Sequence, residues 1–183
     1  MSFARITAPS FSDVDADDYF AEAVEWAVAN GITNGTSAAN FSPDASCTRA
    51  QMVTFQWRSA GSPAPNTSSN PFEDVKASAY YYDAVLWAVE TGVTNGTSAA
   101  AFSPDATVTR GQTVTFLYRA AGSPEALNGT AFTDVAADAY YAPAVAWAVQ
   151  QAITTGTSAS TFSPDADCTR AQIVTFLFRS KAE

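Results

Sequence analysis

Short apolar segments recur along the chain at helical spacing and alternate with polar, turn-rich stretches. The first such segment places five apolar residues three or four positions apart, on one face of a helix: Phe20, Ala23, Val24, Ala27 and Val28. Gly31 ends the pattern, and Asp17 or Asp18 stands where a helix N-cap belongs. The pattern therefore predicts an amphipathic helix between these two caps.

A second helix is predicted from Thr48 to about Ala60. Thr48 and Gln51 have the spacing of a capping box, in which each side chain accepts a hydrogen bond from the other residue's backbone N–H. Residues 32–46, between the two helices, carry Asn-Gly and Pro-Asp turn signals. A short apolar stretch such as 31–33 could pair as a very brief strand.

This helix–loop–helix unit occurs three times. The motif Phe-x-Asp-Val begins at residues 11, 72 and 132, and the Thr-Arg pair that opens the second helix begins at residues 48, 109 and 169. We divide the chain into an N-terminal extension (1–10), three copies (11–62, 72–123 and 132–183) and two linkers (63–71 and 124–131). Because two short helices cannot bury their apolar faces alone, we expect a mainly α fold in which the copies share one core with approximate threefold symmetry.

Composition excludes several classes of function. The 183 residues carry a net charge of −9, which does not suit binding to nucleic acid or to an anionic membrane surface. The chain has no histidine, which removes Ser–His and Cys–His catalysis and most zinc sites. We find no repeated carboxylate pair, phosphate-cradling loop or cluster of metal ligands. The sequence thus predicts a non-enzymatic chain with neither metal nor cofactor.

The amino end, MSFARITAPS, lacks the apolar core of a signal peptide. No run approaches the ~18–20 apolar residues of a membrane helix. We expect either a cytoplasmic protein or a piece of a secreted one.

Six of the nine Lys and Arg residues occupy only two positions of the repeat. One set lies near the end of the second helix, where a cation complements the helix dipole and needs no further role: Arg58, Arg119 and Arg179. The other set directly follows the N-cap, where a cation opposes the dipole: Arg49, Arg110 and Arg170. With the unpaired N–H groups of a helix start, these arginines suit a carboxylate or phosphate ligand. The alternative is a bridge to an aspartate of a neighbouring copy (Asp13, Asp74 or Asp134), and the two roles are compatible.

For several other repeated residues, the sequence allows either a structural role or a role in ligand binding. The aspartates of the Phe-x-Asp-Val motif either fix a loop or hydrogen-bond a polyol. The tryptophans of the first helix either pack in the core or stack on a sugar ring: Trp26, Trp87 and Trp147. Tyrosines at the start of that helix could line a groove: Tyr19, Tyr80, Tyr81, Tyr140 and Tyr141. Cys47 and Cys168 occupy a slot that holds Val108 in copy two, which predicts free, buried thiols.

Taken in order, Phe-x-Asp-Val, a Trp-Ala-Val helix, Gly-Ile-x-x-Gly, Phe-x-Pro-Asp and Thr-Arg-Ala-Gln resemble the S-layer homology (SLH) domain across residues 11–180. The resemblance implies tandem repeats arranged as a three-pronged prism of helix pairs. It also implies non-covalent anchoring at the bacterial cell surface through a secondary cell-wall polysaccharide, often carrying ketal-linked pyruvate, bound in grooves between repeats. The chain would then be fused to a larger secreted protein. The alternative function is a structural or protein-interaction module that binds no glycan.

By this resemblance, ligand-binding positions fall on the arginines Arg49, Arg110 and Arg170, the aspartates Asp13, Asp74 and Asp134, and the loop glycines Gly31, Gly35, Gly92, Gly96 and Gly156. Several residues depart from the family pattern. The family's Glu is replaced by Gln51, Gln112 and Gln172, and copy two has Gly111 where Ala is usual. In copy three, Ala152 replaces the first loop glycine and Thr155 replaces an asparagine, so we expect its groove to be the weakest or altered.

Overall fold

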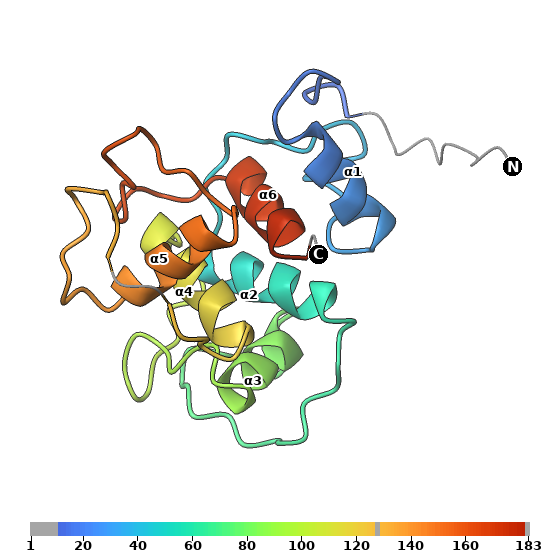
Figure 1. Ribbon diagram of the computed structural model, residues 1–183. Helices are drawn as coiled ribbons and strands as arrows, with labels where there is room; N and C mark the ends of the chain where they lie inside the picture. The colour runs from blue at the N-terminus through green and yellow to red at the C-terminus, as the bar shows by residue number, and fades with distance from the viewer. Residues whose placement is uncertain (1–10, 127–128, 182–183) are drawn as a thin grey trace, which may run out of the picture.

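The computed structural model describes residues 11–126 and 129–181. The predicted N-terminal extension (1–10), residues 127–128 of the second linker and the last two residues of copy three lie outside the described part. Six helices follow one another along the chain (Figure 1): α1 (Ala21–Ala29), α2 (Arg49–Ser59), α3 (Tyr82–Glu90), α4 (Arg110–Ala120), α5 (Ala142–Gln150) and α6 (Arg170–Lys181). Each copy contributes two helices, which confirms the predicted mainly α fold.

The first helix of copy one begins after a tight turn. The expected cap by Asp17 or Asp18 is wrong, because the N-cap is Phe20, which makes no side-chain cap bond. Asp18 stabilises the preceding turn instead: its carboxylate accepts from the Asp15 N–H at 2.8 Å and its carbonyl from the Ala21 N–H at 3.0 Å. The helix ends at Ala29 and the chain turns at Gly31 with φ +68°, as predicted.

The second helix of each copy has the predicted capping box. The Thr48 side chain accepts from the Gln51 N–H at 3.2 Å, and the Gln51 side chain accepts from the Thr48 N–H at 3.0 Å. The same reciprocal bonds join Thr109 to Gln112 and Thr169 to Gln172. A glutamine at this position therefore closes the box in all three copies.

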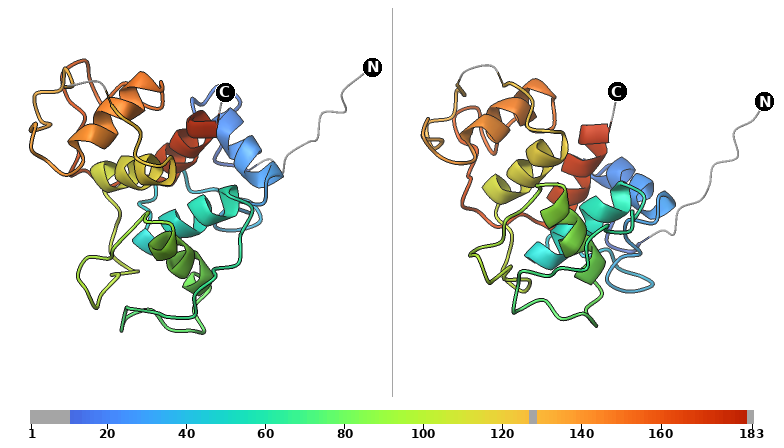
Figure 2. Two further views of the ribbon diagram at one scale, coloured as in Figure 1. Left: turned by 60° about the horizontal axis from the view of Figure 1, so that its bottom comes forward. Right: turned by 90° about the horizontal axis from the view of Figure 1, so that it is seen from below.

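The helices pair between copies. Helix α2 packs on α3, α4 on α5, and α6 on α1, while α2, α4 and α6 meet around the centre (Figures 1 and 2). The tryptophans lie at these joins: the Trp26 ring is 5.6 Å from Phe178 and the Trp147 ring 5.8 Å from Tyr118. Because α6 returns to α1, the three copies form a closed ring with one shared core.

Backbone hydrogen bonds close the ring at its centre. The Cys47 N–H donates to the Cys168 carbonyl at 3.2 Å, the Cys168 N–H to Val108 at 2.9 Å, and the Val108 N–H to Cys47 at 2.9 Å. The short bridges beside this triangle join residues 46, 48, 107, 109, 167 and 169. The expectation of a brief strand at residues 31–33 is not met, because these residues lie in a helix C-terminal turn and the start of a loop.

Both cysteines are free and buried, as predicted. Burial raises the pKa of Cys47 to about 12 and that of Cys168 to about 11. The thiols are therefore neutral, space-filling groups beside the centre of the ring.

Candidate ligand-binding grooves

The arginine at the start of each second helix reaches into the next copy. The Nε–H of Arg49 donates to the Phe102 carbonyl at 2.8 Å, and only 3% of the arginine is exposed. The same bond joins Arg110 to Phe162 at 2.9 Å and Arg170 to Phe41 at 2.8 Å. Each bond links one copy to its successor, and the third links copy three back to copy one.

Two aromatic rings enclose each guanidinium. The central carbon of the Arg49 guanidinium lies 4.9 Å from the Phe102 ring centroid and 5.4 Å from that of Phe116. These are cation–π distances, which offset part of the cost of burying a charge. Burial lowers the pKa of Arg49, while nearby Tyr140 and Asp74 raise it. An arginine starts from so high a pKa that it stays charged here.

The motif aspartate holds the same peptide group from its other side. The Asp74 carboxylate accepts from the Phe102 N–H at 2.9 Å and from the Ser103 N–H at 2.7 Å. The peptide between Phe102 and Ser103 thus gives its carbonyl to Arg49 and its N–H to Asp74. Ser103 has φ +57°, a conformation that costs a non-glycine residue energy, and these bonds hold it there.

These hydrogen bonds distinguish between the two roles suggested for the aspartate, fixing a loop or binding a polyol. Asp74 fixes a loop, and it acts together with Arg49 through the peptide that both contact rather than through an ion pair. Burial alone would raise the pKa of Asp13 and Asp134. Hydrogen bonds from two loop amides, with the charge of Arg170 or Arg110, lower these pKa values below the usual range of a carboxyl group.

The backbone N–H groups of the second helix are already used. The Arg49 N–H donates to Ala106 at 2.8 Å, the Ala50 N–H to Pro104 at 3.0 Å, and the next N–H belongs to the capping box. The expectation that unpaired amides of this helix start face a ligand is therefore wrong. At this helix start, the group that could still bind an anion is therefore the arginine side chain.

A cavity of about 360 Å³ opens beside Arg49 and is lined by all three copies. Copy one supplies Arg49, copy two supplies its loop (Gly96 and Thr97) and one face of α4 (Gln112 and Arg119), and copy three supplies Tyr140. We call this cavity the Arg49 groove. It is assembled only when the ring is closed.

The same arrangement surrounds the other two arginines. Tyr140 lies near Arg49 and Arg119, Tyr19 near Arg110 and Arg179, and Tyr80 near Arg58 and Arg170. In each tyrosine burial raises the pKa and the neighbouring arginine lowers it. The three rings are 60–63% exposed. We name the equivalent surfaces beside the other two arginines the Arg110 groove and the Arg170 groove.

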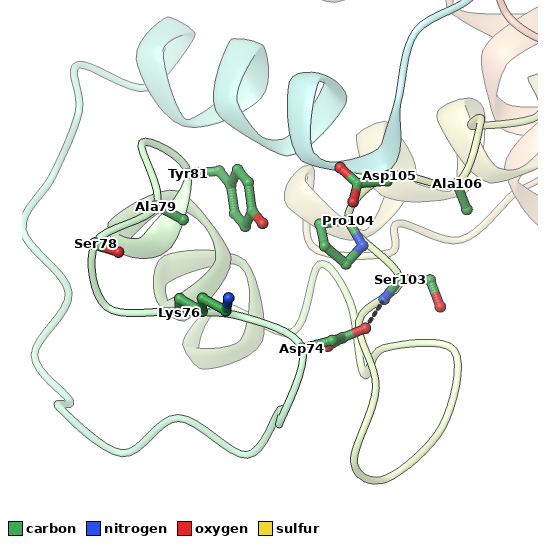
Figure 3. Close-up of a pocket in the computed structure, with 9 residues that line it drawn as sticks. All are labelled: Asp74, Lys76, Ser78, Ala79, Tyr81, Ser103, Pro104, Asp105 and Ala106. Carbon is green, nitrogen blue, oxygen red and sulfur yellow. Dashed lines mark hydrogen bonds between the residues drawn. The ribbon is translucent and has the colours of Figure 1, made fainter.

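The structure brings together some of the predicted site residues and separates others. Arg49 and Gly96 line one groove. Asp74 lines a different, open pocket of about 600 Å³, next to Lys76, Tyr81 and Asp105 (Figure 3). Ser103, whose N–H donates to Asp74, also lines this open pocket. The lining residues of the two pockets show that the repeated Arg and Asp do not share one cavity.

The loop glycines differ in what they do. A Cβ on Gly96 would lie 2.4 Å from the Phe72 ring and 2.5 Å from the Ala101 carbonyl, so only glycine fits there. A Cβ on Gly31 or Gly92 would meet nothing within 4 Å. Ala152 adopts the same left-handed conformation with φ +55°. Replacing the first loop glycine therefore leaves the backbone of copy three unchanged.

Sequence reasoning missed several groove residues. Arg119 was explained by the helix dipole alone, yet its Nη1 donates to the Val93 carbonyl at 3.2 Å and the side chain lines the Arg49 groove. Gln112, Thr115 and Arg119 lie on one face of α4, and all three line the groove. Their i, i+3, i+7 spacing was the available signal.

The comparisons with known proteins agree with this architecture. The sequence profile described as "S-layer homology domain" matches residues 10–53, 71–114 and 131–174. The chain belongs to this family and carries three tandem copies of its domain.

Relatives of this chain include bacterial surface proteins. The "Surface-layer 125 kDa protein" of Lysinibacillus sphaericus is 35% identical over 99 residues, 54% of this chain and 8% of that protein. The "S-layer protein" of Bacillus thuringiensis subsp. finitimus is 26% identical over 175 residues, 93% of this chain and 21% of that protein. An "Endoglucanase" of Bacillus sp. (strain KSM-635) is 31% identical over 117 residues, 64% of this chain and 12% of that protein.

The chain thus spans about a fifth or less of the length of these relatives. The family match and these relatives together indicate that the chain is a bacterial cell-surface anchoring module. None of the six described helices has the length and apolarity needed to cross a bilayer. Within residues 11–126 and 129–181, no group of three or more Cys, Asp or Glu side chains is arranged to hold a metal ion.

Proposed function

We propose that the chain anchors its parent protein by binding an acidic cell-wall polysaccharide, with one acidic sugar in a groove. The observation that carries this proposal is the Arg49 guanidinium. It is almost fully buried, its Nη2 has no hydrogen-bond partner within residues 11–126 and 129–181, and it lines a cavity of about 360 Å³. A buried, unpaired donor on a permanent cation favours an anionic ligand.

A ketal-linked pyruvate suits this site chemically. It leaves a free carboxylate on the sugar, which can accept hydrogen bonds from the guanidinium. The Nε–H bond to Phe102 fixes the arginine in advance, so little side-chain entropy is lost on binding. Gln112, Thr97 and Arg119 offer partners for hydroxyl groups. The exposed Tyr140 ring offers a face on which a sugar can stack.

Several grooves on one polymer would add avidity to modest affinities. A chain that carries one bound sugar presents the next at high effective concentration, and the gain can reach about 10²–10⁴. The proposed partner is thus a repeating polysaccharide, and the native protein would carry further domains, as its longer relatives suggest.

The test uses sedimentation with purified bacterial cell-wall sacculi. Sacculi treated with mild acid, which removes ketal-linked pyruvate, should retain at least about tenfold less protein than untreated sacculi. The triple variant Tyr19→Ala, Tyr80→Ala, Tyr140→Ala should bind weakly to untreated sacculi while its unfolding temperature stays close to that of the wild type. Val149→Ala, which alters an exposed apolar side chain that is not a groove residue, is the matched control.

Tyrosine variants are preferred to arginine variants because each arginine also joins two copies. Equal sedimentation with acid-treated and untreated sacculi would reject the proposal. That result would favour the alternative function, a structural or protein-interaction module that binds no glycan.

A further inference from the structure

The three repeated arginines differ in how their outer nitrogens are bonded. The Nη2 of Arg170 donates to the Thr33 hydroxyl at 3.3 Å. The Nη2 atoms of Arg49 and Arg110 are buried and have no partner among the described residues. All three arginines make the same Nε–H bond to a phenylalanine carbonyl. The difference is therefore confined to the outer end of the guanidinium.

The neighbouring slot residue strengthens this difference. The Cys47 thiol lies beside Arg170. The equivalent residue of copy two is Val108, which has no polar side-chain atom. Arg170 thus has two polar neighbours from copy one, the Thr33 hydroxyl and the Cys47 thiol, whereas the slot that matches Arg49 is apolar.

A bound ligand gives a larger gain in free energy at an unpaired hydrogen-bond donor than at a donor that already has a partner. A buried N–H without a partner carries a desolvation cost, which a bound carboxylate would remove. A carboxylate that engages Arg170 instead competes with the Thr33 and Cys47 contacts that already hold the guanidinium. One net hydrogen bond corresponds to about threefold to tenfold in affinity.

We propose that the grooves are unequal: the Arg49 groove binds an acidic sugar more strongly than the Arg170 groove, because Thr33 and Cys47 occupy the arginine of the latter. This inference rests on the proposed function, since it ranks sites for the same ligand. It places Thr33 and Cys47 as positioning residues that act through Arg170. The sequence-based expectation that the groove of copy three is the weakest or altered rested on Ala152 and Thr155, whereas this inference rests on Thr33 and Cys47 of copy one.

The test follows each arginine separately by NMR. The Nε–H signals of Arg49, Arg110 and Arg170 in the ¹⁵N-labelled chain are assigned from single Arg→Lys variants. Methyl 4,6-O-(1-carboxyethylidene)-α-D-glucopyranoside, a simple pyruvate ketal, is titrated, and its carboxylate methyl ester is the uncharged control probe. The Arg49 signal should shift at about threefold to tenfold lower ketal concentration than the Arg170 signal.

Two variants, with a third as a matched control, test the cause of the difference. Thr33→Val removes the hydroxyl that accepts from Arg170 and from the Gly35 N–H. Thr94→Val removes the equivalent loop bond to the Gly96 N–H, but no bond to Arg49. Of the two threonine variants, only T33V should strengthen binding in its own groove. Comparison of T33V with T94V therefore separates the effect of the bond to Arg170 from the effect of the loop bond that both variants lose. Cys47→Val, which copies the slot of copy two, should also strengthen the Arg170 groove.

The outcomes separate the two proposals. If all three signals shift together, or Arg170 shifts first, the ranking is overturned while the proposed function stands. If the signals separate but T33V and C47V leave the Arg170 groove unchanged, Thr33 and Cys47 are not the cause and the inference fails. If the ketal moves none of the signals, or the methyl ester moves them equally, the acidic-sugar site itself is rejected.

Discussion

At the residue scale, the central feature is a buried arginine that is both part of the fold and the candidate ligand contact. Arg49 holds the Phe102 carbonyl of the next copy, while Asp74 holds the Phe102 and Ser103 amides. Both residues therefore set the shape of a single loop. Repetition of this pair in all three copies is explained by the fold even before any ligand is considered.

The loop-fixing aspartates should make stability depend on pH. The pKa of Asp134 is lowered in the folded state, so its contribution is fully present above its unfolded pKa, about 3.9, and is lost as pH falls through the lower folded value. Asp134→Asn loses one of two amide bonds and should cost about 1–2 kcal/mol at pH 7.

Urea unfolding of wild type and Asp134→Asn at pH 7 and pH 3 measures this dependence. The difference in unfolding free energy between the two proteins should shrink at the lower pH. Asp138→Asn, at an exposed carboxylate, is the control and should differ little from wild type at either pH. A difference for D134N that is the same at both pH values would contradict the assignment.

At the element scale, each loop contains one glycine that cannot be replaced, and in copies one and two it also contains a first glycine that can. The second loop glycine packs against the motif phenylalanine: a Cβ on Gly35 would lie 2.6 Å from Phe11 and 2.6 Å from the Asn40 carbonyl. The first loop glycine ends the helix in open space. The first loop position requires only a left-handed φ, and in copy three Ala152 adopts this conformation.

Substitution of the two glycines should therefore have unequal effects. Gly35→Ala combines a positive φ with a clash and should cost about 3 kcal/mol. Gly31→Ala adds only the conformational cost, about 1 kcal/mol. Thermal unfolding of both variants and of Ala152→Gly, which relieves a left-handed alanine, gives the comparison. Similar losses for G31A and G35A would show that the packing against Phe11 does not matter.

At the scale of the whole molecule, the unit of folding and of binding is the closed ring. Each helix pair joins two copies, and the Arg49 groove takes residues from all three. Removal of one copy should therefore damage every groove rather than one in three.

A chain that ends at residue 123 tests this dependence. It loses α6, the partner of α1, together with the Arg170 bond to Phe41 and with Tyr140 of the Arg49 groove. It should show no cooperative thermal transition by circular dichroism, because two copies leave apolar faces uncovered. A circular permutant that begins at residue 69 and rejoins copy three to copy one keeps all three copies, and it should unfold cooperatively. A truncated chain with a near wild-type midpoint would contradict the closed-ring description.

The sequence by itself determined the local features of this protein. The helical periods, the capping boxes of Thr48, Thr109 and Thr169, the helix stop at Gly31 and the threefold repetition depend on neighbours within a few residues, and all agree with the structure. The repeat also indicated which arginine set lacked a simple local reason. These signals are readable because helix geometry is set by near neighbours in the chain.

Tertiary structure alone decided which copies meet and which atoms stay free. The partner of Arg49 is 53 residues away and that of Arg170 is 129 residues away. The tyrosine beside each arginine comes from the copy that supplies neither the arginine nor its phenylalanine partner. The helix amides that looked free from the sequence are taken by carbonyls of the next copy. The bond from Arg170 to Thr33, which lie 137 residues apart, likewise depends on packing. Such contacts follow from how the ring closes, a long-range condition that no local pattern of residues records.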